Sequence, residues 1–174
     1  QLQKTVKTKV TATQVARYCD LLTNGKHIAD FKGSRNGLQH KGTRPVRKVG
    51  AAVDAGAKVF AEAARRGIDF LIVHHGMYWR PVSPEREVRS LRKAALKKTG
   101  LSLYSSHLPL DAHPAIGNNP LIAQDHGPKV ADRSVDYEGL PIACICKGIP
   151  RATLRKRLKA SYPETYKGIE FGSA

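Results

Sequence analysis

The stretch Ile68-Asp69-Phe70-Leu71-Ile72-Val73-His74-His75-Gly76, residues 68–76, decides how this sequence is expected to fold. Its first six residues form a short, nearly continuous apolar run, the pattern of a strand buried on both faces in a parallel sheet. An Ala-rich segment from Ala57 to Arg66 precedes the run and predicts a helix that ends at Gly67. The region therefore predicts a strand that follows a helix.

The same alternation of helices and strands extends in both directions. Upstream we expect a helix over Thr13–Leu22, a polar stretch over Asn24–Gly42 with a turn at Asn36-Gly37-Leu38, and a strand over Val46–Val53. Downstream we expect a helix over Glu85–Lys98, a strand over Leu101–Ser105, a helix capped by Asn119-Pro120 that runs to Gln124, a strand over Ile142–Cys146 and a helix over Ala152–Leu158. This order predicts a layered α/β fold with a mainly parallel sheet.

Size and composition limit the class of protein. A chain of 174 residues is expected to form one domain, residues 1–174. No apolar run approaches the ~20 residues that cross a bilayer, and the start of the sequence lacks the apolar core of a secretory signal. Three cysteines without regular spacing favour a reducing compartment, so we expect a cytoplasmic protein without a membrane partner.

The charge of the sequence is strongly positive. Thirty Lys and Arg residues face fourteen Asp and Glu residues, a formal net charge of +16, and residues 1–50 hold eleven basic residues against two acidic ones. Such a field attracts polyanions, including nucleotides and nucleic acids. A soluble surface that happens to be basic explains the charge equally well.

His74 and His75 are candidate metal ligands because they follow the buried apolar run directly. In open α/β sheets, ligand sites gather at the carboxyl ends of strands. Adjacent side chains on a regular strand point to opposite faces. Both histidines can therefore serve one site only if the strand ends there, or if each binds a different ion of a pair ~3.5–4 Å apart.

A second group of candidate ligands follows the next predicted strand. The loop His107-Leu108-Pro109-Leu110-Asp111-Ala112-His113-Pro114 places two imidazoles and a carboxylate within seven residues. A carboxylate between imidazoles suits a divalent ion, and Asp can bridge two ions through its two oxygens. Histidines that only bond to backbone carbonyls are the alternative, which the nearby His74-His75 pair makes the weaker of the two.

Other candidate groups have simpler explanations. Cys144 and Cys146 could ligate a metal, but on a strand they share a face with Ile142 and are better explained as core residues. Asp54 follows a predicted strand and either orients a ligand or caps the strand end. Tyr78-Trp79-Arg80 could stack on a purine, although packing against a lid or another subunit is slightly favoured.

Two basic helical faces could contact nucleic acid, although most such faces are only solvated. They comprise Arg86, Arg89, Arg92, Lys93, Lys97 and Lys98 in one helix, and Arg151, Arg155, Lys156, Arg157 and Lys159 in the other. No base-reading motif accompanies them.

Several segments together resemble one known family. They are Asn36-Gly37-Leu38-Gln39, the stretch from Phe70 to Trp79, the loop from His107 to Pro114, and Gly117-Asn118-Asn119. These segments closely resemble the NGG-one-interacting-factor-three-like dinuclear metal-centre proteins, also labelled GTP cyclohydrolase 1 type 2 homologues. The resemblance extends from about Thr13 to Gly172.

This resemblance implies an architecture and a site. The architecture consists of two intertwined three-layer α/β/α units with a mainly parallel sheet, assembled into a ring-like homo-oligomer. The site holds two divalent cations (Zn, Fe or Mn), with His74 on one ion, His75 on the other and Asp111 between them. His107 has no place among the direct ligands in that pattern, so we expect it to support a ligand or to handle protons in catalysis.

The sequence departs from the family near its end. The family completes its site with a His and a Glu from a C-terminal motif, which this sequence does not contain. The last residues, Ile169 to Ala174, look like the point before a missing final segment, so we expect the C-terminal portion to be absent. His126 and Glu170 do not lie in a matching motif and are not assigned as ligands.

Three functions from different classes follow from these observations. The first is a metal-dependent hydrolase acting on a purine nucleotide or a related heterocycle, as the family label suggests. The second is a metal-binding or regulatory protein without catalysis. The third is a basic, degenerate member that binds a polyanion in a nucleoprotein assembly, which the charge of +16 favours.

Overall fold

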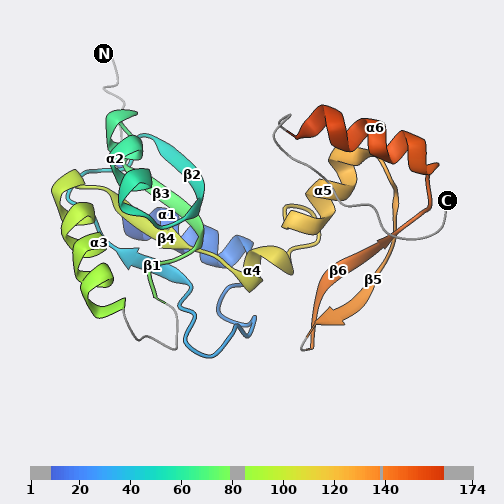
Figure 1. Ribbon diagram of the computed structural model, residues 1–174. Helices are drawn as coiled ribbons and strands as arrows, with labels where there is room; N and C mark the ends of the chain where they lie inside the picture. Colours follow the sequence, from blue (N-terminus) through green and yellow to red (C-terminus); the bar gives the residue numbers. More distant parts are fainter. Residues whose placement is uncertain (1–8, 79–84, 138, 163–174) are drawn as a thin grey trace, which may run out of the picture. The chain divides into compact units, whose positions relative to one another are not determined.

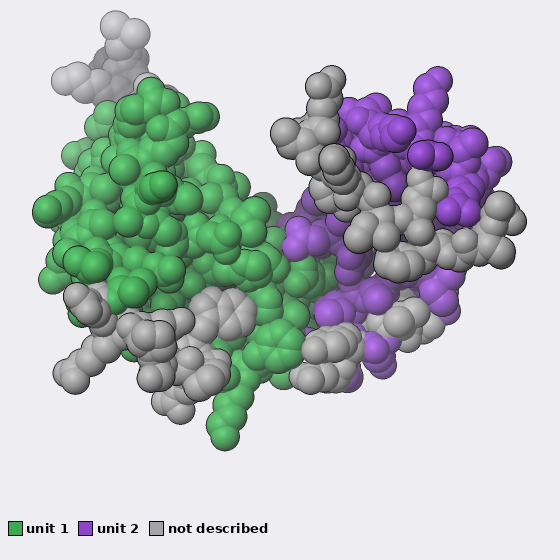
Figure 2. Space-filling view, in the orientation of Figure 1, with its two compact units in different colours: residues 1–113 green, residues 114–174 purple. Residues whose placement is uncertain are grey.

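The computed structural model describes residues 9–78, 85–137 and 139–162 (Figure 1). The chain divides into two compact units, residues 1–113 and residues 114–174 (Figure 2). The expected single domain over residues 1–174 stays a prediction.

The first unit is built around a four-stranded sheet. Its elements are α1 (Ala12–Leu22), β1 (Gly37–His40), β2 (Val49–Asp54), α2 (Ala57–Arg65), β3 (Phe70–His75), α3 (Glu85–Thr99), β4 (Ser102–Ser105) and α4 (Leu108–Asp111). The strand order is β1-β4-β3-β2, with β2, β3 and β4 parallel and β1 antiparallel to β4. The predicted α/β fold with a mainly parallel sheet is confirmed.

Helices cover both faces of this sheet. Alternate residues of a strand face opposite sides, and β3 is apolar at every position from Phe70 to Val73. Phe70 and Ile72 pack with α1 in one cluster, whereas Leu71 and Val73 pack in a second cluster with residues of α2 and α3. The described part of this unit therefore has three layers, α/β/α, and the run that opened the sequence analysis forms its central buried strand.

Two segments before the central strand differ from expectation. The predicted turn at Asn36-Gly37-Leu38 is instead the start of β1, and Gly37 has a φ of 94°, which an L side chain rarely adopts. The strand expected from Val46 begins only at Val49. The reason is Asp69, whose carboxylate accepts hydrogen bonds from the backbone N–H groups of Arg47 (3.1 Å) and Lys48 (3.2 Å) and so replaces their sheet partners.

The second unit pairs a hairpin with two helices. Its elements are α5 (Asn118–His126), β5 (Val130–Tyr137), β6 (Leu140–Cys146) and α6 (Arg151–Ser161). The strand β5 was not predicted from the sequence, and the prediction of Asn119 as the cap of α5 was wrong. Gly117 occupies the cap position, Asn119 lies within the first turn of the helix, and the Asn119 amide donates to the carbonyl oxygen of Ile142 in β6.

Among the described residues, no helix is both long and apolar enough to cross a membrane.

Candidate metal centre

The candidate ligands gather at the carboxyl ends of the three parallel strands. His74 and His75 are the last two residues of β3, and His107 follows β4 by two residues. Asp54, the last residue of β2, is paired in register with His75. Asp111 ends the single turn of α4, whose first hydrogen bonds run back to the carbonyl oxygen of His107. All these residues belong to the first unit, at the edge where the sequence predicted a site.

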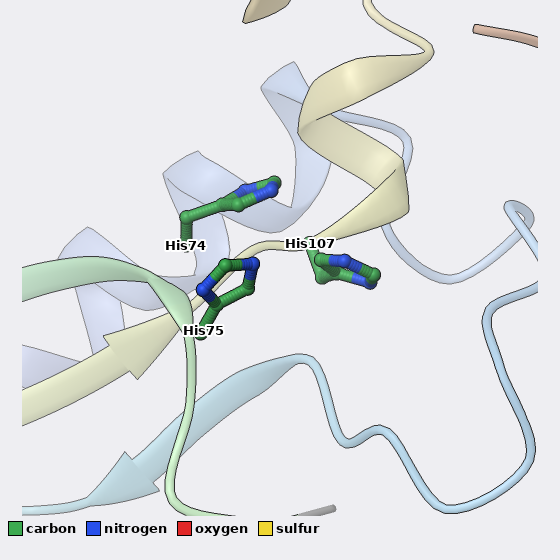
Figure 3. A group of neighbouring side chains, drawn as sticks. All are labelled: His74, His75 and His107. Atoms are coloured by element: carbon green, nitrogen blue, oxygen red, sulfur yellow. The ribbon is translucent and has the colours of Figure 1, made fainter. Parts of the chain in front are cut away.

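Three imidazole rings form the centre of this site (Figure 3). The centroid of the His74 ring lies 4.7 Å from that of His75 and 4.8 Å from that of His107, and the His75 and His107 centroids are 5.6 Å apart. One nitrogen from each ring lies within 4.8 Å of the other two. β3 pairs with β4 only as far as Val73 opposite Ser105, whereas it stays paired with β2 as far as His75 opposite Asp54, and the rings of His74 and His75 lie close together at this end of the strand.

Each of the three rings has its Nδ1 against an oxygen atom. The partner of His74 Nδ1 is the carbonyl oxygen of Ser106, at 3.1 Å. The partners of His75 and His107 are carboxylate oxygens of Asp54 and Asp30, both at 2.8 Å. Carbonyl and ionised carboxylate oxygens only accept hydrogen bonds, so a neutral ring beside them carries its proton on Nδ1 and a lone pair on Nε2. Metal-binding histidines are oriented in this way.

Asp111 places a carboxylate oxygen beside the rings. Its Oδ2 lies 3.4 Å from His74 Nε2, and both side chains are largely buried. Burial lowers the pKa of His74, the charge of Asp111 opposes this shift, and the neighbouring His107 and His75 lower the pKa further. The net direction is downward, which favours the neutral, metal-binding form of His74.

Asp30 and Asn36 are site residues that the sequence analysis missed. Asp30 lies 77 positions before His107 in a loop without a recognisable ligand motif, so spacing gave no signal. Burial raises the pKa of Asp30, but hydrogen bonds from Asn36, His107 and the Phe31 N–H outweigh it and hold that pKa below its ordinary value. Asp54 was expected either to orient a ligand or to cap a strand, and its contact with His75 supports the first role.

The other residues singled out in the sequence are not members of the described histidine cluster. His113 is half-buried and is not one of the three clustered histidines. Cys144 and Cys146 are half-buried on β6 in the second unit, outside both described core clusters. His126 is buried at the end of α5. Trp79, Arg80 and Glu170 lie outside the described residues.

Tyr78 packs within its own unit. Its ring lies against the core cluster under α2 and α3, with Arg35 at 5.7 Å and Lys93 at 5.6 Å from the ring centroid. These two cations occupy the region that a stacked purine would need, so the described contacts favour a packing role.

The donor set fits a divalent metal ion. Three imidazole nitrogens and one carboxylate oxygen are the ligands that Zn²⁺ and Fe²⁺ accept readily, and the carboxylate also suits Mn²⁺. The three Nδ1 contacts are the observation that decides the fit, because each leaves the lone pair on the nitrogen that a metal would use.

The fold and the site together define an α/β protein with a candidate metal centre at the carboxyl edge of its sheet. Residues 11–165 match the sequence model of the family described as Duf34/NIF3 (NGG1p interacting factor 3). The match covers well over half of the chain, and the chain belongs to this family. The resemblance inferred from the sequence motifs is confirmed.

Similar proteins come from archaea and bacteria. A protein of Archaeoglobus fulgidus named "GTP cyclohydrolase 1 type 2 homolog" is 40% identical over 77% of this chain and 54% of its own length. A protein of Escherichia coli K12 with the same name is 38% identical over 64% of this chain and 44% of its own length. A crystal structure from Thermus thermophilus is 42% identical, with a TM-score of 0.62 over 68% of this chain and 49% of that one. The chain spans about half the length of the relatives it matches.

Proposed function

We propose that this chain contributes ligands to a divalent metal centre of a hydrolase. The observation that carries the proposal is the cluster of three histidines whose Nδ1 atoms all face oxygen acceptors. We propose two cations, of Zn, Fe or Mn, with His74 and His75 on separate ions and Asp111 between them. The distance of 3.4 Å from Asp111 Oδ2 to His74 Nε2 supports a shared site.

The residues of the chain have separate tasks in this proposal. Bound divalent cations supply Lewis-acid chemistry that lowers the pKa of a water molecule toward neutrality. Asp54 and the Ser106 carbonyl hold His75 and His74 in the orientation that ligands need. His107 accepts or donates a proton in the reaction, and the ring nitrogen that accepts this proton must be Nε2. The contact of His107 Nδ1 with Asp30 supports that tautomer.

The proposed substrate is a purine nucleotide or a related heterocycle. The name of the similar proteins, "GTP cyclohydrolase 1 type 2 homolog", supports this class. A metal-binding or regulatory protein without catalysis is the alternative, and it uses the same site. We also propose a homo-oligomer in the cytoplasm, a location that the three free cysteines support.

Turnover assays separate the hydrolase from the non-catalytic protein. The whole protein, loaded in turn with Zn²⁺, Fe²⁺ and Mn²⁺, is incubated with GTP and a panel of purine and pteridine heterocycles. Metal-dependent ring opening that disappears in the His74→Ala variant is the expected result. Bound metal without turnover of any compound would contradict the hydrolase and leave the regulatory protein. The Asp20→Asn variant, altered outside the cluster, is the matched control.

A second function, nucleic-acid binding, is favoured by a basic surface at the opposite end of the sheet. The surface consists of Lys41, Arg44, Arg47, Lys48, Arg65, Arg66, Lys97 and Lys98, which we call the basic edge. The Thr43 N–H donates to the carbonyl of Gly100 just after α3, and Lys48 Nζ donates to the carbonyl of Arg66 after α2, so these segments adjoin.

The acidic residues near the basic edge, Asp69 and Glu62, form hydrogen bonds or ion pairs with neighbouring groups. Asp69 is buried and accepts hydrogen bonds from backbone groups, and Glu62 pairs with Arg65 and Arg66 at 2.7 Å. The positive charge of the edge is therefore only partly offset. Most of its side chains are exposed, as are Arg151, Arg155, Lys156 and Lys159 of α6.

Salt dependence tests this second function. Binding of duplex and single-stranded oligonucleotides to the whole protein should weaken steeply as salt rises, because each neutralised phosphate releases a counterion. Replacing Lys41, Lys48 and Lys97 by Gln should weaken binding further and flatten the salt dependence. No binding at low salt would eliminate the function.

A further inference from the structure

Asp30 is the centre of a buried hydrogen-bond network beneath the metal centre. Its side chain is 7% exposed, and that of His107 is 9% exposed. Its Oδ1 accepts from the Phe31 N–H at 2.7 Å and from His107 Nδ1 at 2.8 Å. Its Oδ2 accepts from the Asn36 amide at 2.7 Å and from the Leu108 N–H at 3.2 Å. A carboxylate has about four lone-pair sites, so these donors fill it.

Asn36 links Asp30 to the backbone of His107. Its side-chain oxygen accepts from the His107 N–H at 2.7 Å, while its amide group donates to Asp30. The backbone and the ring of His107 are therefore both fixed by one segment, residues 30–36. The Phe31 ring lies 5.7 Å from the His107 ring, centroid to centroid, and adds packing to the polar contacts.

The contact between Asp54 and His75 is much more exposed to solvent than the contact between Asp30 and His107. The distance is the same, 2.8 Å, but the Asp54 side chain is 70% exposed and that of His75 is 42% exposed. Water competes for an exposed pair and screens it, whereas a buried and fully bonded carboxylate has one geometry available. Of these two carboxylates, Asp30 holds its histidine far more rigidly.

We propose that Asp30, together with Asn36, positions His107 so that its Nε2 faces a divalent cation beside His74 and His75. This inference rests on the proposed metal centre. The Nε2 lone pair ligates the cation when the metal is bound and is open to a proton only when it is not, so His107 contributes directly to metal affinity. The segment 30–36, which precedes β1, thereby becomes part of the site although it contains no ligand.

The first measurement needs neither a variant nor a metal. Nitrogen-15 NMR of the metal-free whole protein should show His107 in the tautomer with its proton on Nδ1. A proton on Nε2 would overturn the proposal. This result is independent of whether the protein binds metal, so failure of the metal centre and failure of the positioning role remain distinguishable.

The second measurement is the affinity for Co²⁺, followed by its absorption spectrum. Asp30→Asn should weaken binding about 10- to 100-fold, the usual effect of losing a carboxylate that orients a histidine ligand. Asp20→Asn is the matched control, because Asp20 is also a partly buried acceptor, for the Tyr104 hydroxyl at 2.8 Å, and does not touch the histidines. Its affinity should stay within about twofold of the wild type.

A double-mutant cycle distinguishes positioning from general support of the fold. In a His107→Ala background, Asp30→Asn should cause little further loss, because it acts through the missing ring. An equal loss in both backgrounds would overturn the positioning role, as would unchanged Co²⁺ affinity in the single variant. If the wild type binds no Co²⁺ while the tautomer is as expected, the proposed metal centre fails instead.

Discussion

Single residues show how far the site could be predicted. The closeness of His74, His75 and Asp111 was predictable because polar residues directly after buried strands meet at one edge of the sheet. Asp30 was not, because its contact with His107 depends on how the loop before β1 folds back across the chain. Likewise, the closeness of the His74 and His75 rings depends on the local geometry at the end of β3, which the sequence does not specify.

Replacing Asp111 by Asn should weaken metal binding without unfolding the protein. The substitution keeps the size of the side chain but removes the negative charge beside His74. We expect at least about a tenfold loss of Zn²⁺ affinity, measured by competition with a chromophoric chelator, and a melting temperature within a few degrees of the wild type. Full affinity in this variant would exclude Asp111 as a ligand.

Tyr104 should make the first unit sensitive to alkaline pH. Burial raises the pKa of Tyr104, and the hydrogen bond to Asp20 and the charge of that carboxylate raise it further. A raised pKa in the folded state means that the stabilisation is complete below the unfolded value of about 10 and is lost as the pH rises above it. Stability measured by urea unfolding should therefore fall above about pH 10.

The Tyr104→Phe variant is the control for this pH effect. It should be less stable at neutral pH by about 0.5–1.5 kcal/mol, the usual net value of one hydrogen bond. It should also lose part of the alkaline dependence. An unchanged pH profile would show that Tyr104 does not cause it.

At the scale of elements, strong apolar periodicity was predictive and weak patterns were not. The buried strand β3 and the helices α1, α2, α3 and α6 were predicted within a few residues of their observed bounds. The strands β1 and β5 were missed because their sequences are largely polar, Gly37-Leu38-Gln39-His40 in the first case. Their pairing is determined by the neighbouring strand, which local sequence does not reveal.

The junction between β1 and β4 depends on a close approach at Gly42. A Cβ at this position would lie 2.7 Å from the Leu101 carbonyl carbon and closer still to the Gly100 carbonyl oxygen. Both are backbone atoms and cannot move aside by changing rotamer. Gly42→Ala should therefore destabilise the protein by about 1–3 kcal/mol, measured by urea unfolding.

Gly148→Ala is the matched control for this prediction. Nothing lies within 4 Å of a Cβ at Gly148, so the change should alter stability by less than about 0.5 kcal/mol. Equal losses of stability in the two variants would show that the close backbone approach at Gly42 does not make this position sensitive to a Cβ atom.

At the scale of the whole molecule, family membership and the α/β architecture followed from the sequence, but activity did not. The chain spans about half the length of the relatives it matches, and its described residues include a cluster of three histidines that could hold a metal ion. The charge of +16 is distributed over both units and coincides with no base-reading motif.

The most direct test of the account is the metal content of the whole protein. Elemental analysis after purification without chelators should find a transition metal or zinc in the wild type and almost none in the triple variant His74→Ala, His75→Ala, His107→Ala. Circular dichroism of the variant should show that the fold is retained. The same metal content in the wild type and in the folded triple variant would contradict the central claim, that these three histidines form the metal centre.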